Sequence, residues 1–177
     1  MSEISKALEE CGALQFGEFT LASGLKSNYY INIKKASTDP KVLYLISQLM
    51  AETLQKKNIR PDKIAGIVLG SIPLAAALSM ATGIPYVMVR KEQKDHGTMN
   101  LIEGDLNKGD KVLVVEDVIT TAGSSVKAIE VLRQNGAVIT DIITVVDREG
   151  GGKENLAKIG VSLSSLITGS EIVKGKK

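Results

Sequence analysis

The segment from Lys111 to Ser125, KVLVVEDVITTAGSS, combines residue types that can do chemistry together. It begins with an apolar run, continues with the adjacent carboxylates Glu116 and Asp117, and ends in hydroxyl-bearing and small residues. An apolar run without polar alternation is typical of a strand that is buried on both faces. After Ser125, apolar residues recur at helical spacing as far as Gly136, the expected end of a helix. The segment therefore predicts a strand, an acidic pair, a small polar loop and a helix.

The small polar loop has the features of a phosphate-binding site. Small residues let backbone N–H groups approach an anion, the start of a helix adds partial positive charge, and hydroxyls donate hydrogen bonds to phosphate oxygens. The two carboxylates repel phosphate but accept hydrogen bonds from vicinal hydroxyls, so a ribose 5-phosphate would satisfy both halves of the segment. An ordinary strand and helix, with Asp and Thr only capping the helix, is the alternative. The residues predicted to bind this ligand are Glu116, Asp117, Val118, Ile119, Thr120, Thr121, Ala122, Gly123 and Ser124.

A second cluster of functional side chains follows the apolar run Tyr86 to Val89. The cluster contains the chain's one histidine and consists of Arg90, Lys91, Lys94 and His96. Because Arg and Lys form strong hydrogen bonds with phosphates, and because a closing loop excludes water, we expect a loop that closes over a polyanion. The alternative is a solvated charged hairpin, in which the histidine has no chemical role.

A third candidate lies where the apolar run Ile64 to Leu69 meets a helix that begins near Pro73. A tight turn at Gly70 and Ser71 would point backbone amides at an anion such as pyrophosphate. An ordinary turn, with proline in the first turn of the helix, would have the same pattern. We therefore treat Gly70 and Ser71 as candidate pyrophosphate ligands, with the ordinary turn as the alternative.

Composition and charge limit the class of protein. A length of 177 residues, with 44% apolar and 24% charged residues, is typical of a single globular domain, here 1–177. The net charge of +2 and the dispersed basic residues argue against nucleic acid as a partner. The single cysteine, Cys11, cannot form an internal disulfide and is typical of a reducing cytoplasm. No apolar run approaches the ~18 residues of a membrane span, so we expect a cytoplasmic protein without a membrane partner.

The order of the apolar segments predicts an α/β fold. A hairpin-like hood is expected within about residues 1–35, and strands alternate with helices through a core of about residues 40–150. Such alternation predicts a mostly parallel sheet flanked by helices, with ligands at the carboxyl ends of its strands. The expected strands are 64–69, 86–89, 112–115 and 138–146, and the expected helices are 40–57, 73–81 and one ending at 135.

The segment Val112 to Ser125 resembles the phosphoribosyl pyrophosphate (PRPP) motif of the type I phosphoribosyltransferase family, and the resemblance extends from Phe16 to about Gly152. The basic loop and the hood are similar to those of one branch, the orotate phosphoribosyltransferases. The resemblance implies the type I fold and the transfer of ribose 5-phosphate from PRPP to orotate, which gives orotidine 5'-monophosphate and pyrophosphate in UMP biosynthesis. It also implies Mg²⁺ held mainly by PRPP, and a homodimer whose basic loop reaches the neighbouring subunit.

The same resemblance implies roles for individual residues. The predicted catalytic residues, which would contact pyrophosphate, are Lys94, His96, Lys91 and Arg90. The predicted orotate ligands are Thr120, Arg148, Tyr30, Ile31 and Lys26. Bacterial members often have a lysine where Ala22 stands, and Lys26 is the candidate substitute for it. Some bacterial members also have an aromatic residue and a lysine where this chain has Leu69 and Gly70, so a lysine contact from that turn is lost.

Two other functions stay open at this point. One is phosphoribosyl transfer to a different base, such as a purine, against which the hood and Arg148 argue. The other is a regulator that senses PRPP or a nucleotide and binds DNA, which would carry a helix-turn-helix extension and a clustered basic face. The sequence has neither of these features.

Overall fold

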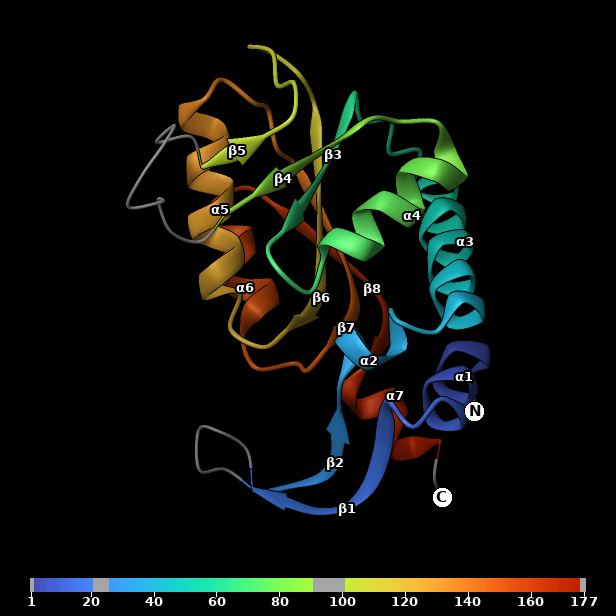
Figure 1. Ribbon diagram of the computed structural model, residues 1–177. Helices are drawn as coiled ribbons and strands as arrows, with labels where there is room; N and C mark the ends of the chain where they lie inside the picture. The colour runs from blue at the N-terminus through green and yellow to red at the C-terminus, as the bar shows by residue number, and fades with distance from the viewer. Residues whose placement is uncertain (1, 21–25, 91–100, 176–177) are drawn as a thin grey trace, which may run out of the picture.

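The computed structural model describes residues 2–20, 26–90 and 101–175, and its elements are labelled in Figure 1. The helices are α1 (Glu3–Glu10), α2 (Ile33–Ala36), α3 (Pro40–Lys56), α4 (Ile72–Thr82), α5 (Gly123–Gln134), α6 (Gly152–Lys158) and α7 (Gly169–Lys174). The strands are β1 (Leu14–Thr20), β2 (Lys26–Ile31), β3 (Lys63–Ile67), β4 (Tyr86–Val89), β5 (Ile102–Glu103), β6 (Val112–Ile119), β7 (Asp141–Asp147) and β8 (Ser162–Thr168).

The main sheet has the strand order β5-β4-β3-β6-β7-β8, and only the short edge strand β5 runs antiparallel to its neighbour. Side chains of successive residues in β6 point to opposite faces: Leu113 and Val115 pack with α3 and α4, and Val112 and Val114 pack with α5. Figure 1 shows these two helical layers on opposite sides of the sheet. The predicted mostly parallel sheet with helices on both faces is therefore confirmed.

The strand β6 is longer than the sequence predicts. The apolar run ends at Val115, but the backbone continues to pair with β7 through Glu116, Val118 and Ile119. A ladder of backbone hydrogen bonds does not require apolar side chains, so the change to acidic residues does not end the strand. Both carboxylates consequently lie within the last four residues of the strand, at its carboxyl end.

The strands β1 and β2 form a separate antiparallel sheet, the hood, which lies beyond the carboxyl ends of the main strands (Figure 1). The guanidinium carbon of Arg148, directly after β7, lies 5.1 Å from the centre of the Tyr29 ring. A Cβ atom at Gly169, the first residue of α7, would lie 2.8 Å from the Tyr29 hydroxyl. The hood is thus held against the carboxyl end of the sheet by residues from the last third of the chain.

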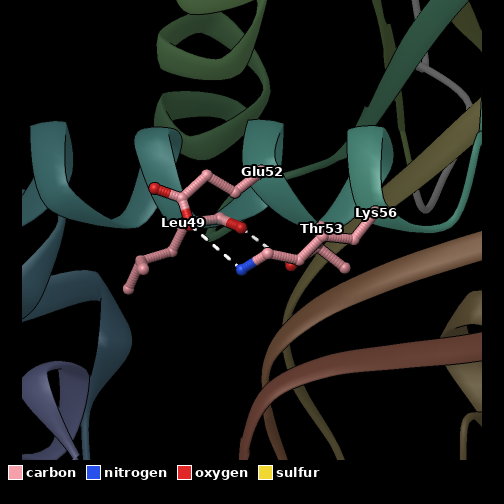
Figure 2. A network of polar contacts seen from close by, with 4 residues as sticks. All are labelled: Leu49, Glu52, Thr53 and Lys56. Carbon is pink, nitrogen blue, oxygen red and sulfur yellow. Dashed lines mark hydrogen bonds and ion pairs between the residues drawn. The ribbon is translucent and has the colours of Figure 1, made fainter.

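The helix α3 begins and ends close to its predicted bounds. Asp39 caps it by accepting hydrogen bonds from the backbone amides of Lys41, at 2.9 Å, and Val42, at 3.2 Å. Figure 2 shows polar contacts farther along the helix, where Lys56 Nζ lies 3.3 Å from a Glu52 carboxylate oxygen. This pair is exposed, so we expect it to contribute only ~0.3–0.5 kcal/mol. The cap is the larger local determinant of the helix.

We expect Asp39→Ala to lower the free energy of unfolding by about 1 kcal/mol, because two amides at the start of α3 lose their acceptor. Asp39→Asn keeps an oxygen acceptor and is the matched control, with stability close to that of the unsubstituted chain. Urea denaturation of the three proteins measures the difference. Equal losses in both variants would show that the charge of Asp39, rather than its hydrogen bonds, stabilises the helix.

Candidate functional site

The residues Thr120 to Ser124, here called the phosphate loop, connect β6 to the first turn of α5. Ala122 has a left-handed backbone conformation (φ 64°) and caps α5 without a side-chain hydrogen bond. The first helical bond runs from Val126 N to Ala122 O, so the amides of Gly123, Ser124 and Ser125 have no acceptor among the described residues. These amides lie at the positive end of the helix dipole, an arrangement that suits an anion.

Glycines from a distant segment lie close behind the phosphate loop. A Cβ atom at Gly150 would lie 2.6 Å from Thr120 Cγ2, and one at Gly152 would lie 2.9 Å from the Thr120 carbonyl oxygen. Asn155 Nδ2 also donates to the Thr121 carbonyl at 3.1 Å. The sequence alone predicts no role for Gly150, Gly152 or Asn155. The sequence does show three glycines directly after a strand and a carboxylate-arginine pair. This pattern indicates a close approach of backbone segments only once the fold is known.

The carboxyl group of Glu116 is buried, with the residue 7% exposed. One of its oxygens accepts a 2.6 Å hydrogen bond from Ser71 Oγ, and the other accepts a 3.3 Å bond from Ser125 Oγ. Burial raises the pKa of Glu116 from 4.5 to about 7, while the Ser71 hydrogen bond lowers it and the charge of Asp117 raises it. The sequence predicts that Glu116 binds the ligand, but the structure directs this carboxyl toward two protein hydroxyls.

The carboxylate of Asp117 is the more accessible of the acidic pair. Its Oδ1 atom accepts a hydrogen bond from the Val118 amide at 2.8 Å, and the carboxylate lies directly against Gly70. Its position between the phosphate loop and the turn after β3 suits it to accept hydrogen bonds from ribose hydroxyls.

The turn between β3 and α4, residues 68–71, offers amides at positions that differ from the prediction. The amides of Leu69 and Gly70 have no acceptor among the described residues, whereas Ser71 N lies 3.3 Å from the Ile67 carbonyl. The Ser71 hydroxyl is donated to Glu116. The turn therefore has free amides at Leu69 and Gly70, whereas the Ser71 amide is engaged.

Of the four predicted catalytic residues, only Arg90 lies within the described part of the chain. Lys91, Lys94 and His96 lie outside the described residues. A guanidinium nitrogen of Arg90 lies 2.8 Å from a carboxylate oxygen of Glu103. Arg90 also lines a cavity of about 390 Å³ together with Gly123 and Ser124, so it faces the start of α5.

The predicted orotate ligands come from two sides of the site. Tyr30 is 42% exposed and its ring centre lies 5.7 Å from that of Phe19, whereas the Ile31 side chain is buried in the core. Lys26 Nζ donates to Thr20 Oγ1 at 3.1 Å within the hood, and Ala22 lies outside the described residues. Arg148 and Thr120 lie at neighbouring strand ends, because Arg148 N donates to the carbonyl of Ile119 at 2.8 Å.

Three further observations concern the part of the chain that the structure describes. Among those residues, no three His, Cys, Asp or Glu side chains are grouped so that they could hold a metal ion. No described helix is both long and apolar enough to cross a membrane.

A hollow of about 500 Å³, lined by Lys57, Arg60 and Lys111 among others, lies at the amino ends of the strands, at the edge opposite the acidic pair.

Comparison with known proteins gives consistent results. The chain matches the family described as "Phosphoribosyl transferase domain" over residues 34–173. It is 48% identical over 171 residues to the orotate phosphoribosyltransferase of Methanocaldococcus jannaschii, with 97% of this chain and 96% of that protein covered. Its structure is similar to that of orotate phosphoribosyltransferase from Aeropyrum pernix, with a TM-score of 0.88, 37% identity and 98% and 97% coverage. It is also similar to Mycobacterium tuberculosis orotate phosphoribosyltransferase in complex with PRPP, with a TM-score of 0.79, 29% identity and 97% and 99% coverage.

The raised pKa of Glu116 predicts a specific dependence of stability on pH. Between pH 4.5 and about pH 7, the folded chain keeps a proton on Glu116 that the unfolded chain releases. The free energy of unfolding therefore falls as pH rises through this window, by on the order of 3 kcal/mol from this group.

Glu116→Gln removes this ionisation. The free energy of unfolding of the variant, relative to that of the unsubstituted chain, should therefore be higher at about pH 8 than at about pH 5. Denaturant unfolding without ligands at both pH values measures the change. The control is Glu130→Gln, which alters an exposed carboxyl group on α5 and should leave the pH dependence as it is. A Glu116→Gln variant with the same pH dependence as the unsubstituted chain would contradict the assignment.

Proposed function

Because the chain belongs to the phosphoribosyltransferase family, and within it to the orotate phosphoribosyltransferases, we propose that it transfers the ribose 5-phosphate of PRPP to orotate. The products are orotidine 5'-monophosphate and pyrophosphate, which places the reaction in UMP biosynthesis. The observation that carries the proposal is the pairing of three free amides at the start of α5 with the accessible carboxylate of Asp117. This pairing suits a ribose that bears a phosphate.

The phosphate loop would hold the 5-phosphate of PRPP. The free amides of Gly123, Ser124 and Ser125 would donate to its oxygens, and the exposed hydroxyls of Thr120 and Thr121 would add further donors. The glycines behind the loop would leave room for the backbone to keep this shape. Binding energy at the phosphate would serve to position C1 of the ribose at the reacting centre.

The two residues of the acidic pair, Glu116 and Asp117, would have different roles. Asp117 would accept hydrogen bonds from the vicinal ribose hydroxyls, and its negative charge would stabilise the cation that develops at C1 as pyrophosphate leaves. Glu116, bonded to Ser71 and Ser125, would position the pyrophosphate turn and the phosphate loop relative to each other. Orotate nitrogen would then attack C1 from the face opposite the leaving group, and no covalent intermediate with the protein is required.

Negative charge grows on pyrophosphate as the bond to C1 breaks, and cationic side chains would stabilise it. We assign this task to Arg90, Lys91, Lys94 and His96, on the resemblance of their segment to the basic loop of the orotate enzymes. In the described structure Arg90 is paired with Glu103, so it would exchange this carboxylate for an oxygen of the substrate. The free amides of Leu69 and Gly70 would bind the same pyrophosphate from the turn after β3.

The donor set suits a magnesium ion that takes most of its ligands from PRPP. Asp117 offers accessible hard oxygen atoms, while the Glu116 oxygens are already bonded to hydroxyls. When bound, Mg²⁺ supplies positive charge that offsets the charge of the pyrophosphate oxygens. The protein's part is to leave room for the ion and to orient the ribose with Asp117.

The orotate base would lie between the hood and the end of β7. Arg148 would direct its guanidinium to the orotate carboxylate, while Tyr30 and the backbone of Ile31 would pack against the ring. The stacking of Arg148 near the Tyr29 ring supports this role, because it brings the arginine to the hood. Thr120 would contribute its hydroxyl, and Lys26 would approach from the hood if it leaves Thr20.

The resemblance also supports a homodimer in the cytoplasm, with the basic loop of one subunit reaching the site of the other. Such sharing would complete each site only in the assembled dimer. Mixing a subunit variant that lacks the loop cations with one that lacks Asp117 would then restore activity in the mixed dimer.

The decisive assay follows orotate absorbance as the purified protein is mixed with PRPP and Mg²⁺, with uracil, hypoxanthine and adenine tested in parallel. Loss of orotate that requires all three components is the expected result. Turnover of a purine instead would replace orotate as the substrate. Binding of PRPP without turnover of any base would favour a regulatory protein.

We expect Lys94→Ala and His96→Ala to lower kcat by about 100-fold or more while changing PRPP affinity much less, because their charge is needed most as pyrophosphate leaves. Steady-state kinetics and equilibrium binding of PRPP measure the two effects. Lys56→Ala, which removes an exposed lysine from α3, is the control and should keep full activity. Equal losses of kcat and affinity would mean that these residues only bind the substrate.

A further inference from the structure

The side chain of Lys34 lies at the turn between β3 and α4. A Cβ atom at Gly70 would overlap the carboxylate of Asp117, with Asp117 Cγ at 2.9 Å, and it would lie 3.3 Å from Lys34 Cε. The turn, the acidic end of β6 and the lysine of α2 therefore meet at one point. Figure 1 shows α2 beside the carboxyl ends of β6 and β7.

The turn itself carries no cation. A side chain at Gly70 would overlap the Asp117 carboxylate, so Asp117 would have to move to admit one. The residues of the turn, Val68 to Ser71, are all uncharged. Its free donors are two amides, because the Ser71 hydroxyl is engaged by Glu116. A cation that assists this turn must therefore come from another element of the fold.

The backbone of Lys34 is held firmly while its ammonium group remains available. Its neighbours Ile33 and Ala36 are buried, and Ser37 Oγ donates to the Lys34 carbonyl at 2.9 Å. Among the described residues, none accepts a hydrogen bond or forms an ion pair with Lys34 Nζ. The adjacent Lys35 differs, since its Nζ donates to the Gly12 carbonyl at 3.3 Å.

We propose that Lys34 binds the pyrophosphate group of PRPP and supplies the positive charge that the β3–α4 turn lacks. This inference rests on the proposed function and adds to it a binding residue from the hood side of the site. A diphosphate next to Asp117 meets electrostatic repulsion, and the ammonium group of Lys34 offsets it. The lysine and the two free amides then bind the leaving group from different elements of the fold.

The test compares Lys34→Ala with Lys34→Arg and Lys35→Ala by calorimetric titration with two ligands, Mg²⁺-pyrophosphate and ribose 5-phosphate. Lys34→Ala should weaken pyrophosphate binding by about 10-fold or more, because a charged hydrogen bond is lost. Its affinity for ribose 5-phosphate, which has no pyrophosphate group, should stay unchanged. Lys34→Arg keeps the charge and should retain most of the pyrophosphate affinity, and Lys35→Ala should retain all of it.

Three results with the variants would overturn the inference: undiminished pyrophosphate binding by Lys34→Ala, an equal loss for both ligands, or the same loss in Lys35→Ala. Orotate turnover by the unsubstituted chain is measured separately. A chain that binds pyrophosphate through Lys34 but does not convert orotate would contradict the proposed function and still support the role of Lys34. An unsubstituted chain that binds no pyrophosphate would overturn that role.

Discussion

The buried carboxyl group of Glu116 connects three elements of the protein through hydrogen bonds. It belongs to β6 in the middle of the sheet, and it accepts hydrogen bonds from the turn before α4 and from the first turn of α5. Burying a carboxyl group carries a free-energy cost, which its raised pKa expresses. In return, the two segments with free amides keep a fixed separation. In the proposed function, a ligand with phosphate groups at both ends of a sugar would meet sites that are already in place.

Around the Glu116 carboxyl group, glycines allow neighbouring segments of the protein to lie close together. Gly150 and Gly152 allow one strand end to lie against the phosphate loop, and Gly70 allows Asp117 to lie against the turn. A methyl group at any of these positions would displace backbone or carboxylate atoms. The small residues of the site therefore serve its shape, while hydroxyl, amide and charged groups from other positions provide the chemistry.

Much of this arrangement could be predicted from the sequence, because it depends on local patterns. The alternation of apolar segments predicted the parallel sheet, and the apolar run followed by carboxylates and a small polar loop predicted where β6 and α5 meet. The partner of Glu116 could not be predicted, since Ser71 lies 45 residues away and its hydroxyl has no distinctive sequence signal. The sequence also does not place Lys34 at the turn between β3 and α4, because a helix of four residues is too short to show periodicity. The edge strand β8, SLSSLIT, was missed because its serines interrupt the apolar pattern.

The contacts of Tyr29 have a consequence for the order in which the protein can be completed during synthesis. This residue comes early in the chain, yet it packs against Arg148 and beside Gly169, which are made late. The hood of a growing polypeptide on the ribosome thus lacks these two contacts until the residues after β7 and the start of α7 have emerged. In the proposed site, the side formed by the hood would consequently gain its contacts with Arg148 and Gly169 only after the phosphate loop has been made.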